Sequence, residues 1–186
     1  MAVKTMAKNT GTGQYNAGWH ELTISKAVDG KWKDKRIIDL NFENYPDNMR
    51  HRVFEASNKT TGEEFKIANL FRFACAGIIS VLQDPTGKNP VIQYDDEVTN
   101  LIGTRVNVLF VKEPSTTDGK EYSRTFDLVP VVQETEHLTW TDDDVTRLKN
   151  NVEKQYTKKT ATTTNGVGTV NLDTTTTVTG DAEIPF

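Results

Sequence analysis

Basic and aromatic residues stand together in one short stretch, where Trp32 is flanked by Lys31 and Lys33 and followed by Lys35 and Arg36. Single-stranded nucleic acid is held by this combination, because cations neutralise phosphates and aromatic rings stack on bases for about 1–3 kcal/mol per base. A tryptophan between two lysines in an expected loop is poorly suited to a core. The predicted nucleic-acid-binding residues are Lys31, Trp32, Lys33, Lys35, Arg36, Arg50, Arg52, Tyr122 and Arg124.

Arg50 and Arg52 share one face of an expected strand, because side chains alternate between the two faces of a strand. The residues on its other face are Met49, His51 and Val53. The competing interpretation is that aromatic residues fill the core while the lysines form a solvated surface. In that interpretation the core aromatics are Trp19, Phe42 and Phe54. We expect Phe42 and Phe54 to be core residues, and Trp32 to belong to the binding site.

Catalytic and metal-binding patterns are scarce. The three histidines (His20, His51 and His137) form no ligand-spaced pair, and no glycine-rich phosphate loop is present. Cys75 lies among apolar residues of an expected helix, where a buried small side chain is the natural interpretation. We therefore expect no metal, no cofactor and no enzymatic activity.

One enzyme pattern stays open as an alternative. Pro46-Asp47 followed by Glu64-Phe65-Lys66 matches the spacing in metal-dependent nucleases, where two carboxylates hold a divalent ion and a lysine assists the attacking water. So short a pattern arises often by chance. Pro46-Asp47 also suits a turn, and Glu64 to Lys66 suits the start of a helix.

Composition and charge favour a cytoplasmic protein of one domain with a polar appendage. The 186 residues are 35% hydrophobic, include a single cysteine, and contain no apolar run long enough to span a bilayer. The N-terminus has no apolar segment typical of secretion signals. Lys and Arg number 12 against 9 Asp and Glu in residues 1–72, 5 against 10 in 73–140, and 5 against 7 in 141–186. The net charges are therefore +3, −5 and −2, which predicts a basic face in the first part of the chain.

Hydrophobic periodicity predicts five strands and two helices. The expected strands are 18–28, 37–44, 49–56, 103–112 and 122–132; the expected helices are 63–83 and 142–156, with an acidic loop or short helix over 88–100. Asp29-Gly30 is expected to close the first strand with a turn, and Pro130 requires an edge or a bulge. Five strands with a helix between the third and fourth is the element order of an OB-fold, a Greek-key barrel that often binds oligonucleotides. A different five-stranded α+β sheet would show the same order.

The predicted organisation has four parts. These are a flexible arm over 1–16, an OB-fold domain over 17–140, a short helix over 141–156, and a disordered Thr-rich tail over 157–186. The tail ends in Gly-Asp-Ala-Glu-Ile-Pro-Phe, a flexible tether with an apolar tip suited to a pocket on a partner. The predicted partner-binding residues are Asp181, Glu183, Ile184, Pro185 and Phe186. This anionic tail could also compete with DNA for the basic face of its own protein.

The tip resembles that of bacterial single-stranded DNA-binding proteins, which end in Asp-Asp-Asp-Ile-Pro-Phe. Ala182 departs from that pattern, and the tail is Thr-rich where the family is usually rich in Gly, Gln and Pro. The strand start at Gly18-Trp19, the stretch KWKDKRIIDLNFE and the helix after the third strand look more like bacteriophage single-stranded DNA-binding proteins. The resemblance implies a non-enzymatic protein of the bacterial host's cytoplasm. Such a protein coats and protects single-stranded DNA without sequence specificity during replication, recombination and repair.

The same resemblance implies that the tip recruits a polymerase, helicase, primase or nuclease. Two other functions stay open from the sequence, the metal-dependent nuclease and an adaptor that binds only proteins. Oligomeric state, binding-site size, cooperativity and the preference for DNA or RNA are open as well.

Overall fold

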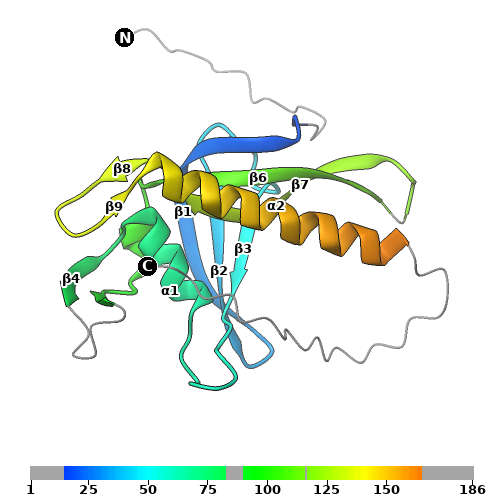
Figure 1. The fold of residues 1–186 in the computed structure, drawn as a ribbon. Coiled ribbons are helices and arrows are strands. Elements are labelled where there is room, and N and C mark those ends of the chain that lie inside the picture. The colour runs from blue at the N-terminus through cyan, green and yellow to red at the C-terminus, as the bar shows by residue number, and fades with distance from the viewer. Residues whose placement is uncertain (1–14, 83–89, 116, 165–186) are drawn as a thin grey trace, which may run out of the picture.

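A five-stranded antiparallel sheet forms the centre of the molecule (Figure 1). The computed structural model describes residues 15–82, 90–115 and 117–164. The strands of this sheet are β1 (Gly18–Trp32), β2 (Lys35–Phe42), β3 (His51–Phe54), β6 (Arg105–Pro114) and β7 (Glu121–Pro130), in the order β3-β2-β1-β6-β7. The protein is therefore mainly β, as the sequence predicts, and all five expected strands are present.

The long strand β1 joins the two halves of the sheet. Its first part, from Gly18 to Thr23, pairs with β6, and its second part, from Ile24 to Trp32, pairs with β2. The register with β2 shifts between Ile24 and Lys26, and such a bulge bends a strand and increases its twist. One continuous strand can therefore serve two partners as the sheet curls.

The turn between β1 and β2 lies later than the sequence predicts. Trp32 pairs with Lys35, so Lys33 and Asp34 form the two-residue turn, and Lys33 has a φ of 55°. Asp29 and Gly30 are paired strand residues instead. The expected turn at Asp29-Gly30 is therefore wrong, because the strand pairing continues past a dipeptide that by itself favours a turn.

The two edge strands of the sheet approach each other. β3 contacts β7, and Thr125 of β7 donates a hydrogen bond from Oγ1 to the carbonyl of Arg50, at 3.1 Å. The curled sheet encloses the main core, whose largest fully buried side chains include Ile24, Ile38, Leu40, Phe42, Phe71, Val106, Val108 and Phe110. Pro130 is the last residue of the outermost strand β7, where its missing N–H costs little.

The expected helix over 63–83 is wrong in its second half. Helix α1 spans Lys66–Ala74, and Cys75 ends it in the left-handed conformation with φ 50°. Gly77 follows with φ 62°, and a Cβ there would lie 2.3 Å from the carbonyl oxygen of Asp95. The chain then pairs as β4 (Ile78–Leu82) with β5 (Val91–Tyr94), followed by the 3-10 helix η1 (Val98–Leu101).

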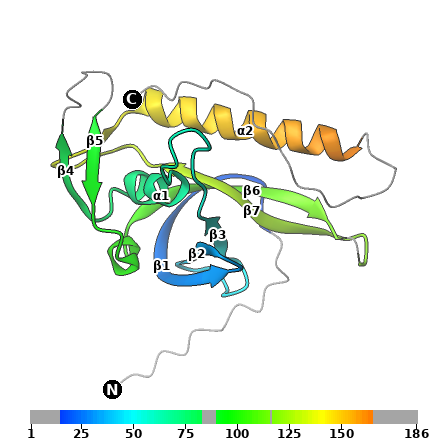
Figure 2. The ribbon, with the colours of Figure 1, turned by 90° about the horizontal axis from the view of Figure 1, so that it is seen from below.

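Helix α2 (Asp142–Thr164) lies outside the main sheet (Figure 2). It continues beyond the expected end at 156. Thr141 and Asp144 begin it with reciprocal contacts: the Asp144 N–H donates to Thr141 Oγ1 at 3.2 Å, and Thr141 Oγ1 donates to the Asp144 carboxylate at 2.7 Å. The short strands β8 (Gln133–Glu134) and β9 (Thr139–Trp140) precede it. No helix in the described part of the chain is long and apolar enough to cross a membrane.

Candidate nucleic-acid interface

The exposed side of the β1–β2–β3 meander carries four of the nine predicted binding residues, Trp32, Lys35, Arg50 and Arg52. The β-ladder registers place one set of side chains on this side, which we call the outer face. It consists of Val28, Gly30 and Trp32 of β1, Lys35, Ile37 and Asp39 of β2, Arg52 and Phe54 of β3, and Arg50 just before β3. The opposite side of β2 and β3 supplies Ile38, Leu40, Phe42, His51 and Val53 to the core. The predicted division of the third strand into two faces is confirmed, and the structure buries the face of Met49, His51 and Val53.

Two aromatic rings meet at one end of the outer face. The rings of Trp32 and Phe54 lie edge to face, with centroids 5.7 Å apart, and the two residues are 48% and 41% exposed. Phe54 is therefore not the core residue that the sequence analysis expects, whereas Phe42 is buried as expected. Every second residue of a strand lies on the same face, so the positions of Arg50 and Arg52 could have predicted that Phe54 lies on this face too.

At Gly30 no side chain projects from the sheet beside these two rings. Gly30 pairs with Ile37, which in turn pairs with Phe54, so the three residues form a row across the strands. Gly30 has no side chain, Val28 is 43% exposed, and Ile37 is buried. An apolar surface of this kind, with two exposed rings at its end, can accept the flat faces of nucleotide bases.

Cations lie beside the rings and along β3. Lys33 places its Nζ 4.6 Å from the centroid of the Trp32 ring. Arg52 forms a two-pronged ion pair with Asp39, at 2.6 and 2.7 Å, and Arg50 lies 3.7 Å from the same carboxylate. The hydrogen bonds from Arg52 hold the pKa of Asp39 below its usual range. The guanidinium groups of Arg50 and Arg52 therefore share the single carboxylate of Asp39, which leaves one net positive charge on this part of the outer face.

Lys31 and Arg36 lie on the other side of the hairpin from Trp32. They pair with each other across the ladder, one position away from the Trp32–Lys35 pair. The Arg36 guanidinium binds Asp29 at 2.6 Å and also binds the Asp96 carboxylate and carbonyl. These bonds, first the one to Asp29, raise the pKa of Arg36 above its usual value. Arg36 therefore clamps the hairpin to the segment before η1, and we assign it no phosphate.

Tyr122 and Arg124 lie on the β6–β7 hairpin rather than on the outer face. The Tyr122 hydroxyl donates to Asp118 at 2.6 Å, and Arg124 lies 3.5 Å from Glu113. Alternation along β7 places both on the same side as Phe126, whose ring contacts Tyr156 of α2. The predicted site is thus divided between the outer face, the opposite side of the β1–β2 hairpin, and the β6–β7 hairpin.

The other tryptophans support packing. Trp140 is 6% exposed and donates from Nε1 to the carbonyl of Arg72 at 3.2 Å. Trp19 lies outside the main core, under α2, and donates to Glu153 at 2.7 Å. Trp32 is therefore the exposed tryptophan of the three.

The residues of the nuclease pattern have other roles. The Glu64 carboxylate accepts the N–H groups of Ile67 and Ala68, at 2.8 and 2.9 Å, and so caps the start of α1. Lys66 pairs with Asp127 at 3.4 Å. In the part of the chain that the structure describes, no three His, Cys, Asp or Glu side chains gather as a possible metal site.

Asp181, Glu183, Ile184, Pro185 and Phe186 of the predicted partner-binding tip lie outside the described residues, as do residues 1–14 of the predicted arm. Comparison with known proteins finds no matching family model and no matching curated protein.

Proposed function

We propose that this chain adopts an OB-fold and binds single-stranded DNA on its outer face. The strand pairing supports the fold: a β1–β2–β3 meander is followed by α1, then by β6 beside β1 and by β7 between β6 and β3. OB-folds bind oligonucleotides on the face of their second and third strands and on the loops after the first and fourth. Here these regions are β2, β3, the Lys33-Asp34 turn and the β6–β7 hairpin.

The observation that carries the proposal is the exposed Trp32–Phe54 pair beside Arg50 and Arg52. Apolar rings of this size are costly to leave in water, and they are useful there when bases stack on them. Bases expose their faces in single strands but not in a paired duplex. Arg50 and Arg52 share the single carboxylate of Asp39, so one net positive charge remains on this side of the sheet for phosphates.

The proposed role is to coat and protect single-stranded DNA, without sequence specificity, during replication, recombination and repair. The tip at Ile184, Pro185 and Phe186 recruits a polymerase, helicase, primase or nuclease. This role agrees with the resemblance to bacteriophage and bacterial single-stranded DNA-binding proteins, and it places the protein in the cytoplasm of a bacterial host. The protein itself catalyses no reaction. The nuclease alternative has less support, because capping of α1 already engages the Glu64 carboxylate.

The test is a titration of a fluorescently labelled dT oligonucleotide with the intact protein at two salt concentrations. We expect affinity to fall steeply with salt, to change little with base sequence, and to fall about tenfold or more in Trp32→Ala, since one stacked base is lost. The control is Phe65→Ala, which removes an exposed ring that is not on the outer face. Absence of binding at low salt would overturn the proposal and favour the protein-only adaptor.

A further inference from the structure

One side of helix α2 packs against the sheet, and the opposite side does not. Leu148, Val152 and Tyr156 pack against the second apolar cluster, on the outside of β6 and β7, with Trp19 and Phe126. This contact fixes the rotation of the helix on the sheet. Asn150, Lys154 and Lys158 lie on the opposite side of the helix and therefore face away from the sheet.

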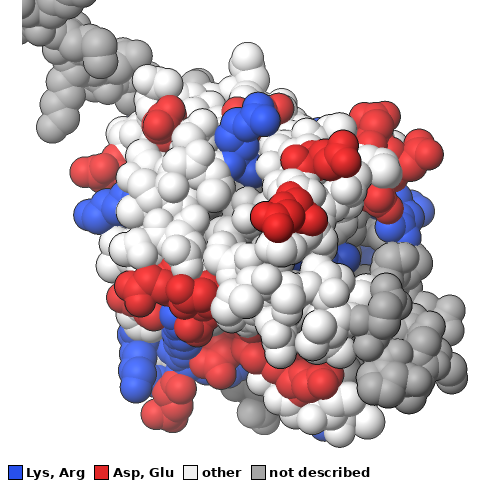
Figure 3. Space-filling model, turned by 90° about the vertical axis from the view of Figure 1, so that its left-hand side faces the viewer, with Lys and Arg blue, Asp and Glu red and all other residues white. Residues whose placement is uncertain are grey.

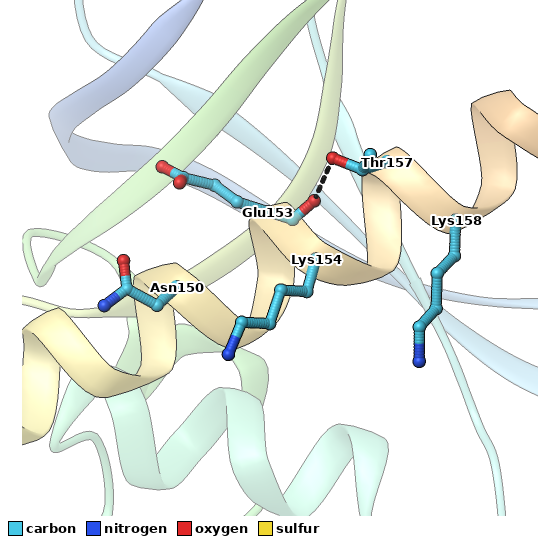
Figure 4. A pocket seen from close by; sticks show the side chains of 5 residues that line it. All are labelled: Asn150, Glu153, Lys154, Thr157 and Lys158. Atoms are coloured by element: carbon cyan, nitrogen blue, oxygen red, sulfur yellow. Dashed lines mark hydrogen bonds between the residues drawn. The ribbon is translucent and has the colours of Figure 1, made fainter.

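Most of helix α2 is basic, although the chain as a whole has a net charge of −4. After its first turn, over 146–164, the helix carries five basic residues against one acidic residue, Glu153. The basic residues are Arg147, Lys149, Lys154, Lys158 and Lys159. In Figure 4, Asn150, Lys154 and Lys158 project to the same side of the helix, whereas the Glu153 side chain points away from them.

We call Asn150, Lys154 and Lys158 the lysine row. All three are exposed, and together with Glu153 and Thr157 they line one shallow hollow along the helix. Their spacing of four residues places successive side chains about 6 Å apart along the helix axis. A row of two ammonium groups and an amide at this spacing can contact successive phosphates of one strand.

Other cations of the same helix have different surroundings. Lys149 places its Nζ 5.5 Å from the Trp19 ring centroid, and Lys159 places its Nζ 5.5 Å from that of Phe126. These two lysines have the same charge and lie on the same helix, but they cover the packed aromatic residues. They offer a matched comparison for the lysine row.

A strand that leaves the outer face can reach the lysine row across β7. Arg50, at one end of that face, is joined to Thr125 of β7, and β7 contacts α2. Arg124, next to Thr125, lies on the α2 side of β7 and is 62% exposed in its side chain. On the end of the molecule that carries β4 and β5, Asp and Glu side chains of the described residues spread across the surface (Figure 3).

We propose that the lysine row is a second phosphate-binding surface, which a single strand reaches only when it is long enough to extend past the outer face and across β7. This inference rests on the proposed function, because the strand is first held by Trp32 and Phe54. The row then adds length-dependent, sequence-independent affinity.

The test compares the double variant Lys154→Gln/Lys158→Gln with the wild-type protein on two dT oligonucleotides. One has about 6 nucleotides, within the site size of a single OB-fold, and the other has about 30. For the long oligonucleotide we expect the slope of log affinity against log salt to become shallower by about 1.4, since each lost phosphate contact on a single strand contributes about 0.7. For the short one we expect no change.

The control is Lys149→Gln/Lys159→Gln, which removes the same charge from the same helix and should leave the slope unchanged. Circular dichroism of both double variants checks that α2 is still folded. An equal loss on both oligonucleotides, an equal loss in the control, or no loss at all would overturn the inference. Tighter binding by the lysine-row variant would also overturn it, because the row would then hold an anionic segment of the protein itself. Failure of the wild-type protein to bind either oligonucleotide would instead refute the proposed function.

Discussion

Trp32 and Phe54 meet edge to face across the outer face, with ring centroids 5.7 Å apart, although they lie on different strands. Each ring limits the orientations of the other, so the pair presents two fixed apolar surfaces. Fixed rings lose little conformational entropy when a base stacks on them. We therefore expect the two rings to act together in binding.

The first prediction concerns Phe54. Phe54→Ala should weaken binding of a dT oligonucleotide by about 1–3 kcal/mol, the usual cost of losing one stacking partner. Its effect on the free energy of unfolding should be smaller than that of a core substitution, because the ring is 41% exposed. Anisotropy titration and urea denaturation measure the two quantities. Normal affinity together with a severe loss of stability would show that Phe54 is a packing residue only.

The second prediction separates two arginines. Arg50→Gln should make the slope of log affinity against log salt shallower by about 0.7, the contribution of one phosphate contact on a single strand. Arg36→Gln should leave that slope unchanged, because carboxylates of Asp29 and Asp96 already hold the guanidinium. It should lower stability by about 1 kcal/mol through loss of partly exposed ion pairs. The same change of slope in both variants would contradict the assignment of Arg36 as a clamp.

The third prediction concerns the buried His51. Burial lowers its pKa to about 4, from an unfolded value of 6.5, so the unfolded chain binds the proton more readily between these two values. Stability should therefore be full above about pH 6.5 and should fall as pH drops toward 4, by roughly 2 kcal/mol between pH 7 and pH 5. Urea unfolding at the two pH values measures this loss. In His51→Gln the part of the loss due to the imidazole should disappear, and an unchanged pH dependence would rule out this origin.

The fourth prediction compares two glycines that both have positive φ. Gly77→Ala should cost several kcal/mol, because the new Cβ would lie 2.3 Å from the Asp95 carbonyl oxygen and the backbone would also be strained. Gly119→Ala should cost only about 1 kcal/mol, since its φ of 67° is similar but nothing lies within 4 Å. Thermal or urea denaturation of the two variants measures the difference. Equal losses would mean that the close approach at Gly77 has no energetic effect.

Local periodicity was sufficient to predict the strands of the main sheet. Successive side chains of a strand point to opposite faces, and this explains why buried and exposed positions alternate in β2 and β3. It also explains why Arg52 lies on one face of β3 and His51 on the other. The position of Pro130 at an edge follows from its missing N–H. These features depend on neighbouring residues, and the sequence contains them.

Features that depend on distant residues were missed. Ile78–Leu82 reads as the end of an apolar helix, and only the backbone at Gly77 and the pairing with β5 make it a strand. In the local sequence Arg36 resembles a phosphate ligand, because its partner Asp96 lies 60 residues away along the chain and does not show in that stretch. Phe54 was assigned to the core because apolar aromatic side chains favour burial, although its alternation with Arg52 places it outside.

Stacking of bases on Trp32 is tested most directly by tryptophan emission during titration with poly-dT, in the wild-type protein and in Trp32→Phe. Phenylalanine can still stack, so labelled DNA should show that the variant binds with an affinity close to the wild-type value. Trp19 and Trp140 are packed elsewhere, so quenching by DNA should be strong in the wild-type protein and nearly absent in the variant. Equal quenching in both proteins, or binding by the wild-type protein without quenching, would contradict the claim.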